Sequence, residues 1–388
     1  MDIRWLIVLA LLLIAGEYAV YQWRGVRSIK YSRRFSDGVV DAFGSVDMVE
    51  VIENNGYLPI PRAVLESTFD RSLVFASGVD LNVRNTERYQ NHRSYFSIGS
   101  KMRIRRTHHI TCMRRGVYHL DSASMTCQDI LGLSTVHVPW KLQGEGLTLI
   151  VRPPVHPIAD PSVGFTSWQG ELPVSRWILP DPFLRSGTRP YQPGDAHNRI
   201  NWKATARTLQ LQVYQEEYTA DPKVMILLNF EIMENMWNQV VAPDRVEAGI
   251  SMAASLAAHY IGLSQAVGFG SNGELVMGEN VEAGVIYPGA GAAHLDEILL
   301  SMAHLEIQVG RAFSDLLADL GLEVRDRTDF ILVTGYVSER IQVQVDNLRA
   351  AGHSVTVLPL PKEEEVESWL GEIRADVGGE IEVNSHAG

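Results

Sequence analysis

The stretch KVMILLNF (Lys223–Phe230) is a short, continuous run of apolar residues, which is typical of a strand buried on both faces in a parallel sheet. Helical and strand patterns alternate after it. We expect helices over 244–263, with Asp244 as the N-cap, and over 292–305, 311–321 and 338–352; we expect strands over 266–270, 329–335 and 353–360. This alternation predicts a doubly wound α/β domain over residues 223–388, in which functional residues follow the carboxyl ends of the strands.

The segment before this domain has a different period. From about residue 31 to residue 152 the apolar residues alternate in short runs, and VDMVEVIENNGYLPI (Val46–Ile60) breaks at Asn55-Gly56, a dipeptide that favours a hairpin. Helical periodicity is missing here. The pattern predicts an antiparallel β-sandwich over 31–152, and its arginines at 103, 105, 106, 114 and 115 make it basic.

Residues 1–30 predict a membrane anchor with a basic flank. The segment 5–23 is apolar, begins and ends with Trp, and at about 1.5 Å per residue is long enough to cross a bilayer core of about 30 Å. A signal-peptide h-region is the alternative, but no small-x-small cleavage site follows. Five basic residues follow the span and one precedes it, so we expect a single-pass cell-membrane protein with its C-terminal body in the cytoplasm.

Composition narrows the classes of function. The 388-residue chain has a net charge of −12, and 25 acidic residues against 8 basic ones follow Phe230, which argues against nucleic acid as a partner. The two cysteines, Cys112 and Cys127, fit neither a disulfide framework nor a zinc pattern. No nucleotide-binding, hydrolase or metalloprotease motif is present, and GFGSNG (Gly268–Gly273) is interpreted as a turn.

Residues 153–222 form a proline-rich linker followed by a dense polar stretch, RPYQPGDAHNRINWKATART (Arg189–Thr208). Pro193-Gly194 suits a turn, and Trp202 is expected to be buried. Three interpretations stay open: a structural clasp on the α/β domain, a clasp that also forms a docking surface, or an active site with Asp195 and His197. The residues assigned to a structural or docking role are Arg189, Tyr191, Gly194, Asp195, Ile200, Trp202, Lys203 and Arg207.

The same stretch resembles the signature of a family catalogued as domain of unknown function fifty-eight. The matching positions are Arg189, Tyr191, Gly194, Asp195, Ile200, Trp202, Ala206, Arg207 and Thr208, and RRGVYHL (Arg114–Leu120) and DILGL (Asp129–Leu133) resemble two further family elements. The resemblance implies a membrane anchor, a β-sandwich and a von Willebrand factor A-like α/β domain. It also implies an association with MoxR-type AAA+ ATPases. Members commonly have a membrane hairpin, whereas this chain has one predicted span.

The resemblance also identifies where a divalent cation would bind in von Willebrand factor A-like domains. Oxygen ligands are expected after the first strand and after a later strand. Here Asn229, Glu231 and Met233 replace the Asp, Ser and Ser of the first set of ligands. Gly335 and Tyr336 stand after the later strand, where an acidic ligand would be expected. We therefore expect no metal and no cofactor.

These features predict a non-enzymatic scaffold or adaptor that is tethered to the membrane. It would present its α/β domain to a cytoplasmic protein, for which a MoxR-type AAA+ ATPase is the candidate, in complex assembly or envelope maintenance. The alternative is a metal-dependent or hydrolytic protein with an unrecognised site at the carboxyl ends of the α/β strands.

Overall fold

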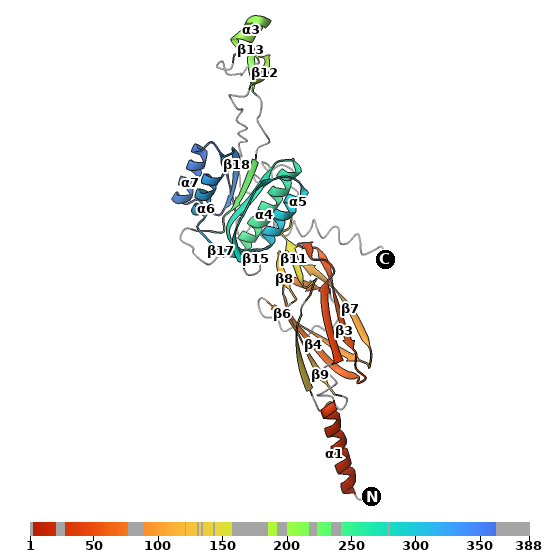
Figure 1. The fold of residues 1–388 in the computed structure, drawn as a ribbon. Helices are drawn as coiled ribbons and strands as arrows, with labels where there is room; N and C mark the ends of the chain where they lie inside the picture. Colours follow the sequence, from red (N-terminus) through yellow and green to blue (C-terminus); the bar gives the residue numbers. More distant parts are fainter. Residues whose placement is uncertain are drawn as a thin grey trace.

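The structure is a computed structural model, and it describes residues 3–20, 28–76, 89–120, 122–129, 132, 135–142, 144–156, 185–191, 200–216, 223–233, 242–277 and 280–361. Figure 1 shows an N-terminal helix, α1 (Ile3–Val20), followed by a β-rich part and then by an α/β part. Within the described residues, no helix is both long enough and apolar enough to cross a membrane. The predicted span 5–23 continues beyond the last described residue of α1.

The β-rich part is a sandwich of two four-stranded sheets with a small third sheet at one end. All neighbours within the two four-stranded sheets are antiparallel, as the alternation of the sequence predicts. The first sheet has the order β1 (Ile29–Phe35), β3 (Ser45–Asn54), β7 (Arg103–Cys112), β5 (Leu73–Phe75); the second has the order β10 (Thr135–Lys141), β9 (Ser122–Gln128), β4 (Ile60–Asp70), β6 (Tyr89–Ile98); the third has the order β2 (Val39–Asp41), β11 (Thr148–Arg152), β8 (Gly116–His119).

The prediction of a hairpin at Asn55-Gly56 is wrong. The two strands that flank this dipeptide, β3 and β4, belong to different four-stranded sheets, so the connection crosses from one layer of the sandwich to the other. Asn54 supports this crossing, because its Oδ1 accepts a hydrogen bond from Gly56 N (2.9 Å) and its Nδ2 donates to Leu58 O (2.8 Å).

A charged cluster lies between the two sheets of the sandwich. Glu50 occupies an inward position of β3 and is buried. Tyr31 Oη donates a hydrogen bond to Glu50 Oε1 (2.6 Å), and His108 Nε2 lies 3.5 Å from Glu50 Oε2. The ring of His92 lies close by, with its centroid 5.4 Å from that of His108.

The α/β part is built on one mixed sheet in the order β16-β15-β14-β18-β19, with β17 also paired to β15. The pairs β15–β14, β14–β18 and β18–β19 are parallel, whereas β16 and β17 pair with β15 in the antiparallel sense. The strands are β14 (Lys223–Leu228), β15 (Val267–Met277), β16 (Asn280–Gly289), β17 (Leu305–Val309), β18 (Thr328–Thr334) and β19 (Ser354–Pro359); the helices are α4 (Pro243–Gly262), α5 (Ala292–Ala303), α6 (Phe313–Glu323) and α7 (Glu339–Ala350).

β14 lies between two helical layers. Val224, Ile226 and Leu228 pack into the cluster that contains α4 and α5. Met225 and Leu227, which alternate with them, pack into the cluster that contains α6 and α7. Burial on both faces explains why the strand is apolar throughout.

The region 185–216 forms a small unit of its own, which we call the arm. β12 (Arg185–Pro190) pairs in the antiparallel sense with β13 (Gln212–Glu216), and α3 (Trp202–Thr208) lies between them in sequence. Figure 1 shows the arm drawn apart from the α/β sheet and its helices.

Two local predictions for the α/β domain are wrong. GFGSNG is not a turn, because all six residues lie inside β15, next to a register shift between Gly270 and Glu274. Asp244 is not the N-cap of α4; the cap is Ala242, with Pro243 at the first helical position, and Asp244 lies in the first turn.

Candidate functional site

A hydrogen-bonded network closes the carboxyl edge of the α/β sheet, where the sequence places its candidate metal ligands. Asn229 follows β14 and is fully buried. Its Nδ2 donates to Thr334 Oγ1 (3.0 Å), and its Oδ1 accepts from Glu231 N (2.9 Å) and from Asn272 Nδ2 (3.1 Å). Thr334 Oγ1 in turn donates to Tyr336 O (2.6 Å).

Glu231 connects this edge to the helix that follows β17. Its Oε1 accepts a hydrogen bond from Phe313 N (2.9 Å), and its Oε2 accepts one from Tyr336 Oη (2.7 Å). Phe313 is the first residue of α6, so the carboxylate also meets the positive end of that helix dipole. Both oxygens of Glu231 are therefore used to hold three chain segments together.

The structure brings four of the five predicted edge positions together. Asn229, Glu231, Gly335 and Tyr336 surround the network, and Gly335 packs against the backbone of Ile232. Met233 is exposed and makes no contact in this network. Across the part of the chain that the structure describes, no group of three or more His, Cys, Asp or Glu side chains is placed to hold a metal ion.

Besides Thr334, the network contains Asn272, which the sequence likewise does not predict. Its Oδ1 accepts from Phe230 N (2.8 Å), and its Nδ2 reaches Arg311 O (3.2 Å) as well as Asn229. Because GFGSNG was interpreted as a turn, its asparagine was not placed at the end of a neighbouring parallel strand. If the segment had been predicted to be a strand, Asn272 would have been placed at the carboxyl edge of the sheet.

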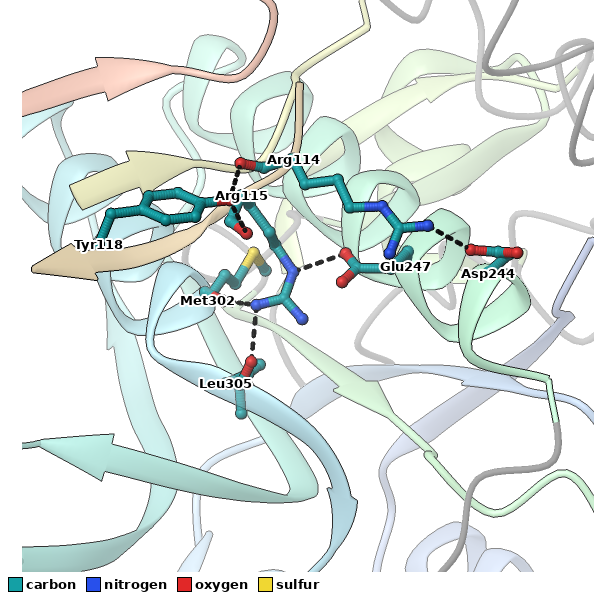
Figure 2. A network of polar contacts seen from close by, with 7 residues as sticks. All are labelled: Arg114, Arg115, Tyr118, Asp244, Glu247, Met302 and Leu305. Carbon is teal, nitrogen blue, oxygen red and sulfur yellow. Dashed lines mark hydrogen bonds and ion pairs between the residues drawn. The ribbon is translucent and has the colours of Figure 1, made fainter. Parts of the chain in front are cut away.

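A second site lies where the sandwich meets the α/β domain, and Arg115 is at its centre (Figure 2). The side chain of Arg115 is only 3% exposed. Its Nε donates to Glu247 Oε2 (2.8 Å), and its Nη1 donates to Met302 O (2.6 Å) and Leu305 O (2.8 Å). One arginine of the sandwich thereby contacts α4, the end of α5 and the start of β17.

The neighbours of Arg115 complete this junction. Arg114 Nη2 donates to Asp244 Oδ1 (2.8 Å) on the surface, and Tyr118 Oη donates to Arg114 O (2.8 Å). Burial raises the pKa of Tyr118, so its hydroxyl stays protonated and able to donate. Gly116 has a φ of +146°, which a residue with a side chain rarely adopts. The Arg-Arg-Gly-x-Tyr element is thus the joint between the two domains.

Further contacts fix the same junction. Ala248 of α4 is fully buried in the apolar cluster of the sandwich. Arg152 Nη1 donates to Asp296 Oδ1 of α5 (2.7 Å), while its Nε donates to Asp41 Oδ1 (2.7 Å). A cleft of about 1170 Å³ opens beside Arg115, and residues of β8 and β17 line it. Any group bound there would touch both domains.

The signature stretch is in the arm, and the prediction that Trp202 is buried is wrong. Trp202 begins α3 and is 68% exposed. Asn201 caps this helix by accepting a hydrogen bond from Ala204 N (3.1 Å). Leu209 ends it in the left-handed conformation (φ 58°) and is 90% exposed. Two large apolar side chains, one at the start of this short helix and one at its C-cap, are therefore exposed to solvent.

The other described members of the stretch build or cover the arm. Ile200 is buried and bridges to Val213, and Tyr191 N donates to Leu211 O (2.8 Å). Arg189 pairs with Val213 in the register of β12 and β13. Lys203 and Arg207 are exposed on α3. Gly194, Asp195 and His197 lie outside the described residues.

The fold and these sites define a class: a mixed α/β protein in which a β-sandwich is joined to an α/β domain, with a polar network closing the edge of its sheet. The model of the family described as "Protein of unknown function DUF58" matches residues 187–376, which include nearly all of the arm and of the α/β domain. This match supports assignment of the chain to that family. The comparison with curated proteins gave no match.

Several solved structures match about a third of the chain. The CARDB domain of the PF1109 protein from Pyrococcus furiosus is 13% identical with a TM-score of 0.20, over 32% of this chain and 91% of that one. The ASH/PapD-like domain of human CEP192 is 10% identical with a TM-score of 0.18, over 32% and 84%. A non-cellulosomal cohesin from Archaeoglobus fulgidus is 10% identical with a TM-score of 0.21, over 30% and 93%. Likenesses at these scores carry no argument about function.

Proposed function

We propose that this chain is a non-enzymatic scaffold or adaptor, tethered to the membrane by its N-terminal helix, that docks a cytoplasmic protein partner through the arm. The observation that carries the proposal is the exposure of Trp202 on α3 and of Leu209 at the C-cap of this helix. Exposed tryptophans with apolar neighbours are characteristic of binding hot spots rather than of soluble surfaces. Because Trp202 is not packed onto the α/β domain, the arm is better suited to docking than to acting as a clasp.

The network at the carboxyl edge supports a structural role for the α/β domain, which we take to be von Willebrand factor A-like. Asn229, Glu231 and Thr334 direct their polar atoms at one another and at backbone groups. Such a domain offers a stable surface instead of a reactive centre. The candidate partner is a MoxR-type AAA+ ATPase, acting in complex assembly or envelope maintenance.

The N-terminal helix supports the tether. Several of its large apolar side chains are exposed, including Trp5, Leu9 and Leu12. A surface of this kind needs a lipid or protein cover. The basic residues that follow it in the sequence would keep the body of the chain on the cytoplasmic side.

Crosslinking and affinity capture from the native host test the adaptor. The full chain is compared with Trp202→Ala and with Leu322→Ala, a matched control because Leu322 is 82% exposed on α6. We expect an AAA+ ATPase with the wild type and with Leu322→Ala, and its loss with Trp202→Ala. Equal recovery with all three chains would remove the arm from the interface. Recovery of no ATPase from the wild type would contradict the proposed partner.

Metal analysis of the purified chain tests the scaffold. We expect no stoichiometric metal, and a melting temperature that Mg²⁺ or Ca²⁺ does not change, because an ion that binds only the folded state would raise it. Stoichiometric Mg²⁺ or Ca²⁺ that is lost in Glu231→Gln would contradict the proposal and favour a metal-dependent activity at the sheet edge.

A further inference from the structure

The end of the sandwich that receives the chain from α1 carries two exposed loops. Ser28 precedes β1, and its backbone oxygen accepts a hydrogen bond from Asn55 N (2.9 Å). Its hydroxyl donates to Asn54 Oδ1 (3.1 Å). The crossing between β3 and β4 therefore lies directly beside the point where the chain enters the sandwich, and Figure 1 shows α1 leading to this end of the molecule.

The crossing is bound to the loop between β6 and β7. Lys101 N donates to Gly56 O (3.0 Å), and Asn54 N donates to Met102 O (2.9 Å). The buried Asn54 side chain joins both loops, because its Nδ2 donates to Leu58 O (2.8 Å) and to Gly99 O (3.0 Å). We call residues 55–59 and 99–103 the rim. Its hydrogen bonds give it a defined surface.

The rim presents an aromatic and an apolar side chain outward. Tyr57 is 83% exposed, and Met102 is exposed beside it in the neighbouring loop. Lys101 Nζ lies over the Tyr57 ring, 4.5 Å from its centroid. An exposed tyrosine with a lysine above its face combines an apolar body with polar tips, the combination that favours the boundary between water and lipid.

Positive charge surrounds these side chains. Lys30, Glu53 and Arg103 stand opposite one another across β1, β3 and β7, so two cations flank one carboxylate. Arg103 Nε lies 3.1 Å from Glu53 Oε1, but the Arg103 side chain is still 67% exposed. With the exposed Lys30 and Lys101, three positive charges stand against the one negative charge of Glu53 on this surface. The acidic residue of the adjacent β9–β10 loop, Asp129, is buried.

We propose that the rim rests on an anionic lipid surface at the base of the N-terminal anchor and thereby holds the sandwich against the membrane. The proposal rests on the tether of the proposed function, because α1 leads the chain to this end of the sandwich. Lys101 and Arg103 would contact lipid phosphates, and Tyr57 with Met102 would enter the headgroup layer. Each basic residue near an anionic leaflet favours the docked state about fivefold, so two of them favour it by more than about tenfold.

The test uses the full chain in nanodiscs of phosphatidylcholine, with and without phosphatidylserine. Tyr57→Cys carries a nitroxide label, and its accessibility to oxygen and to a water-soluble nickel complex is measured by electron paramagnetic resonance. The native thiols do not compete for the label, because burial raises the pKa of Cys112 to about 11 and that of Cys127 to about 12. Leu322→Cys is the control, since it is equally exposed but belongs to α6 of the α/β domain.

We expect the label at Tyr57 to be several-fold less accessible to nickel in discs with phosphatidylserine than the label at Leu322. Combined Lys101→Glu and Arg103→Glu substitutions should restore its accessibility. A label at Tyr57 that stays as open to nickel as the control, in a chain that has entered the discs, would overturn the rim proposal alone. A chain that stays out of the discs would overturn the anchor as well. Protection that appears only in native membranes would assign the rim to a protein and overturn the lipid contact.

Discussion

Arg115 is buried at the domain junction, and its side chain donates hydrogen bonds to Glu247, Met302 and Leu305 on the α/β side. Arg115→Ala removes a charged donor from Glu247 and from the backbone carbonyls of two buried residues, Met302 and Leu305. Breaking a buried pair in this way costs about 3 kcal/mol, because the remaining polar groups lose their partner. We expect a loss of this size in the free energy of unfolding, measured by urea denaturation.

The adjacent arginine provides the control. Arg114 also pairs with a carboxylate of α4, but both side chains of the Arg114–Asp244 pair are largely exposed. Exposed pairs contribute about 0.2–1 kcal/mol, so Arg114→Ala should change stability little. Equal losses in the two variants would mean that the number of arginines at the junction, rather than the burial of Arg115, determines its strength.

His92 gives the sandwich a dependence on pH. Burial, helped by the neighbouring His108, lowers the pKa of His92 to about 4 in the folded chain, against 6.5 when it is exposed. The unfolded chain therefore binds more protons between these values, and the stability due to neutral His92 is complete above pH 6.5. It is lost as the pH falls toward 4, by up to about 3 kcal/mol.

The other charges that face His92 act on its pKa in opposite directions. Arg33 and Arg106 also disfavour its protonation, whereas Glu50 favours it. Burial alone would raise the pKa of Glu50, but its contacts with His108 and Tyr31 outweigh burial and lower it, so this carboxylate also loses its contribution in acid.

Denaturant midpoints measured from pH 7 to pH 4 check the role of His92. We expect His92→Phe to flatten the dependence, because Phe75 already stacks on the His92 ring at 5.2 Å between centroids and can pack on phenylalanine. His137→Gln, at an exposed histidine that contacts Thr126, should keep the slope of the wild type. A slope that survives in His92→Phe would assign the acid sensitivity to Glu50 or to groups outside this cluster.

At the scale of the elements, a substitution in α3 can separate an effect on the stability of the fold from an effect on partner binding. Trp202 is 68% exposed, so Trp202→Ala removes little buried surface and should change the free energy of unfolding by no more than about 0.5 kcal/mol. A buried tryptophan would cost about 3–5 kcal/mol on the same substitution. Thermal unfolding of the full chain distinguishes the two. A large loss of stability in Trp202→Ala would mean that Trp202 is buried and would favour the interpretation of the stretch as a structural clasp.

The strands of the α/β domain show which elements can be predicted from the sequence and which cannot. Short apolar runs predict the parallel strands β14, β18 and β19, and the runs of β14 and β18 are continuous because these two strands are buried on both faces. The antiparallel edge strands β16 and β17 carry no such run and were not predicted. Trp202 could not be placed, since a tryptophan bound by a partner and one buried in a core have the same local pattern.

The glycines of β15 explain the error at the candidate site. A side chain at Gly268 would place its Cβ 2.5 Å from Met225 Sδ, and one at Gly273 would place it 2.6 Å from the Phe230 ring. These glycines allow close packing of neighbouring chain segments and are not needed for a turn. Close packing is a property of the folded sheet, so the sequence could give the candidate positions Asn229, Glu231 and Tyr336 but not the Asn272 that joins them.

At the scale of the whole molecule, the sandwich connects two attachments at its opposite ends. β7 begins at Arg103 in the rim and ends at Cys112, three residues before Arg115 at the domain junction. Its 10 residues span roughly 33 Å at about 3.3 Å per residue. If the rim is held at the membrane, the junction fixes the height and orientation at which the α/β domain meets its partner.

This arrangement predicts a rigid connection that depends on Arg115. Nitroxide labels at Tyr57→Cys and Leu322→Cys, one on the rim and one on α6, should give a single narrow distance distribution by double electron–electron resonance. Domains joined by modest interfaces move relative to each other by default, and here the buried Arg115 and Ala248 oppose that motion. Arg115→Ala should therefore broaden the distribution, while Arg114→Ala should leave it narrow. An unchanged distribution in Arg115→Ala would mean that Ala248 and the Arg152–Asp296 pair are sufficient to hold the domains, and the fixed orientation would then depend on packing between α4, α5 and the sandwich.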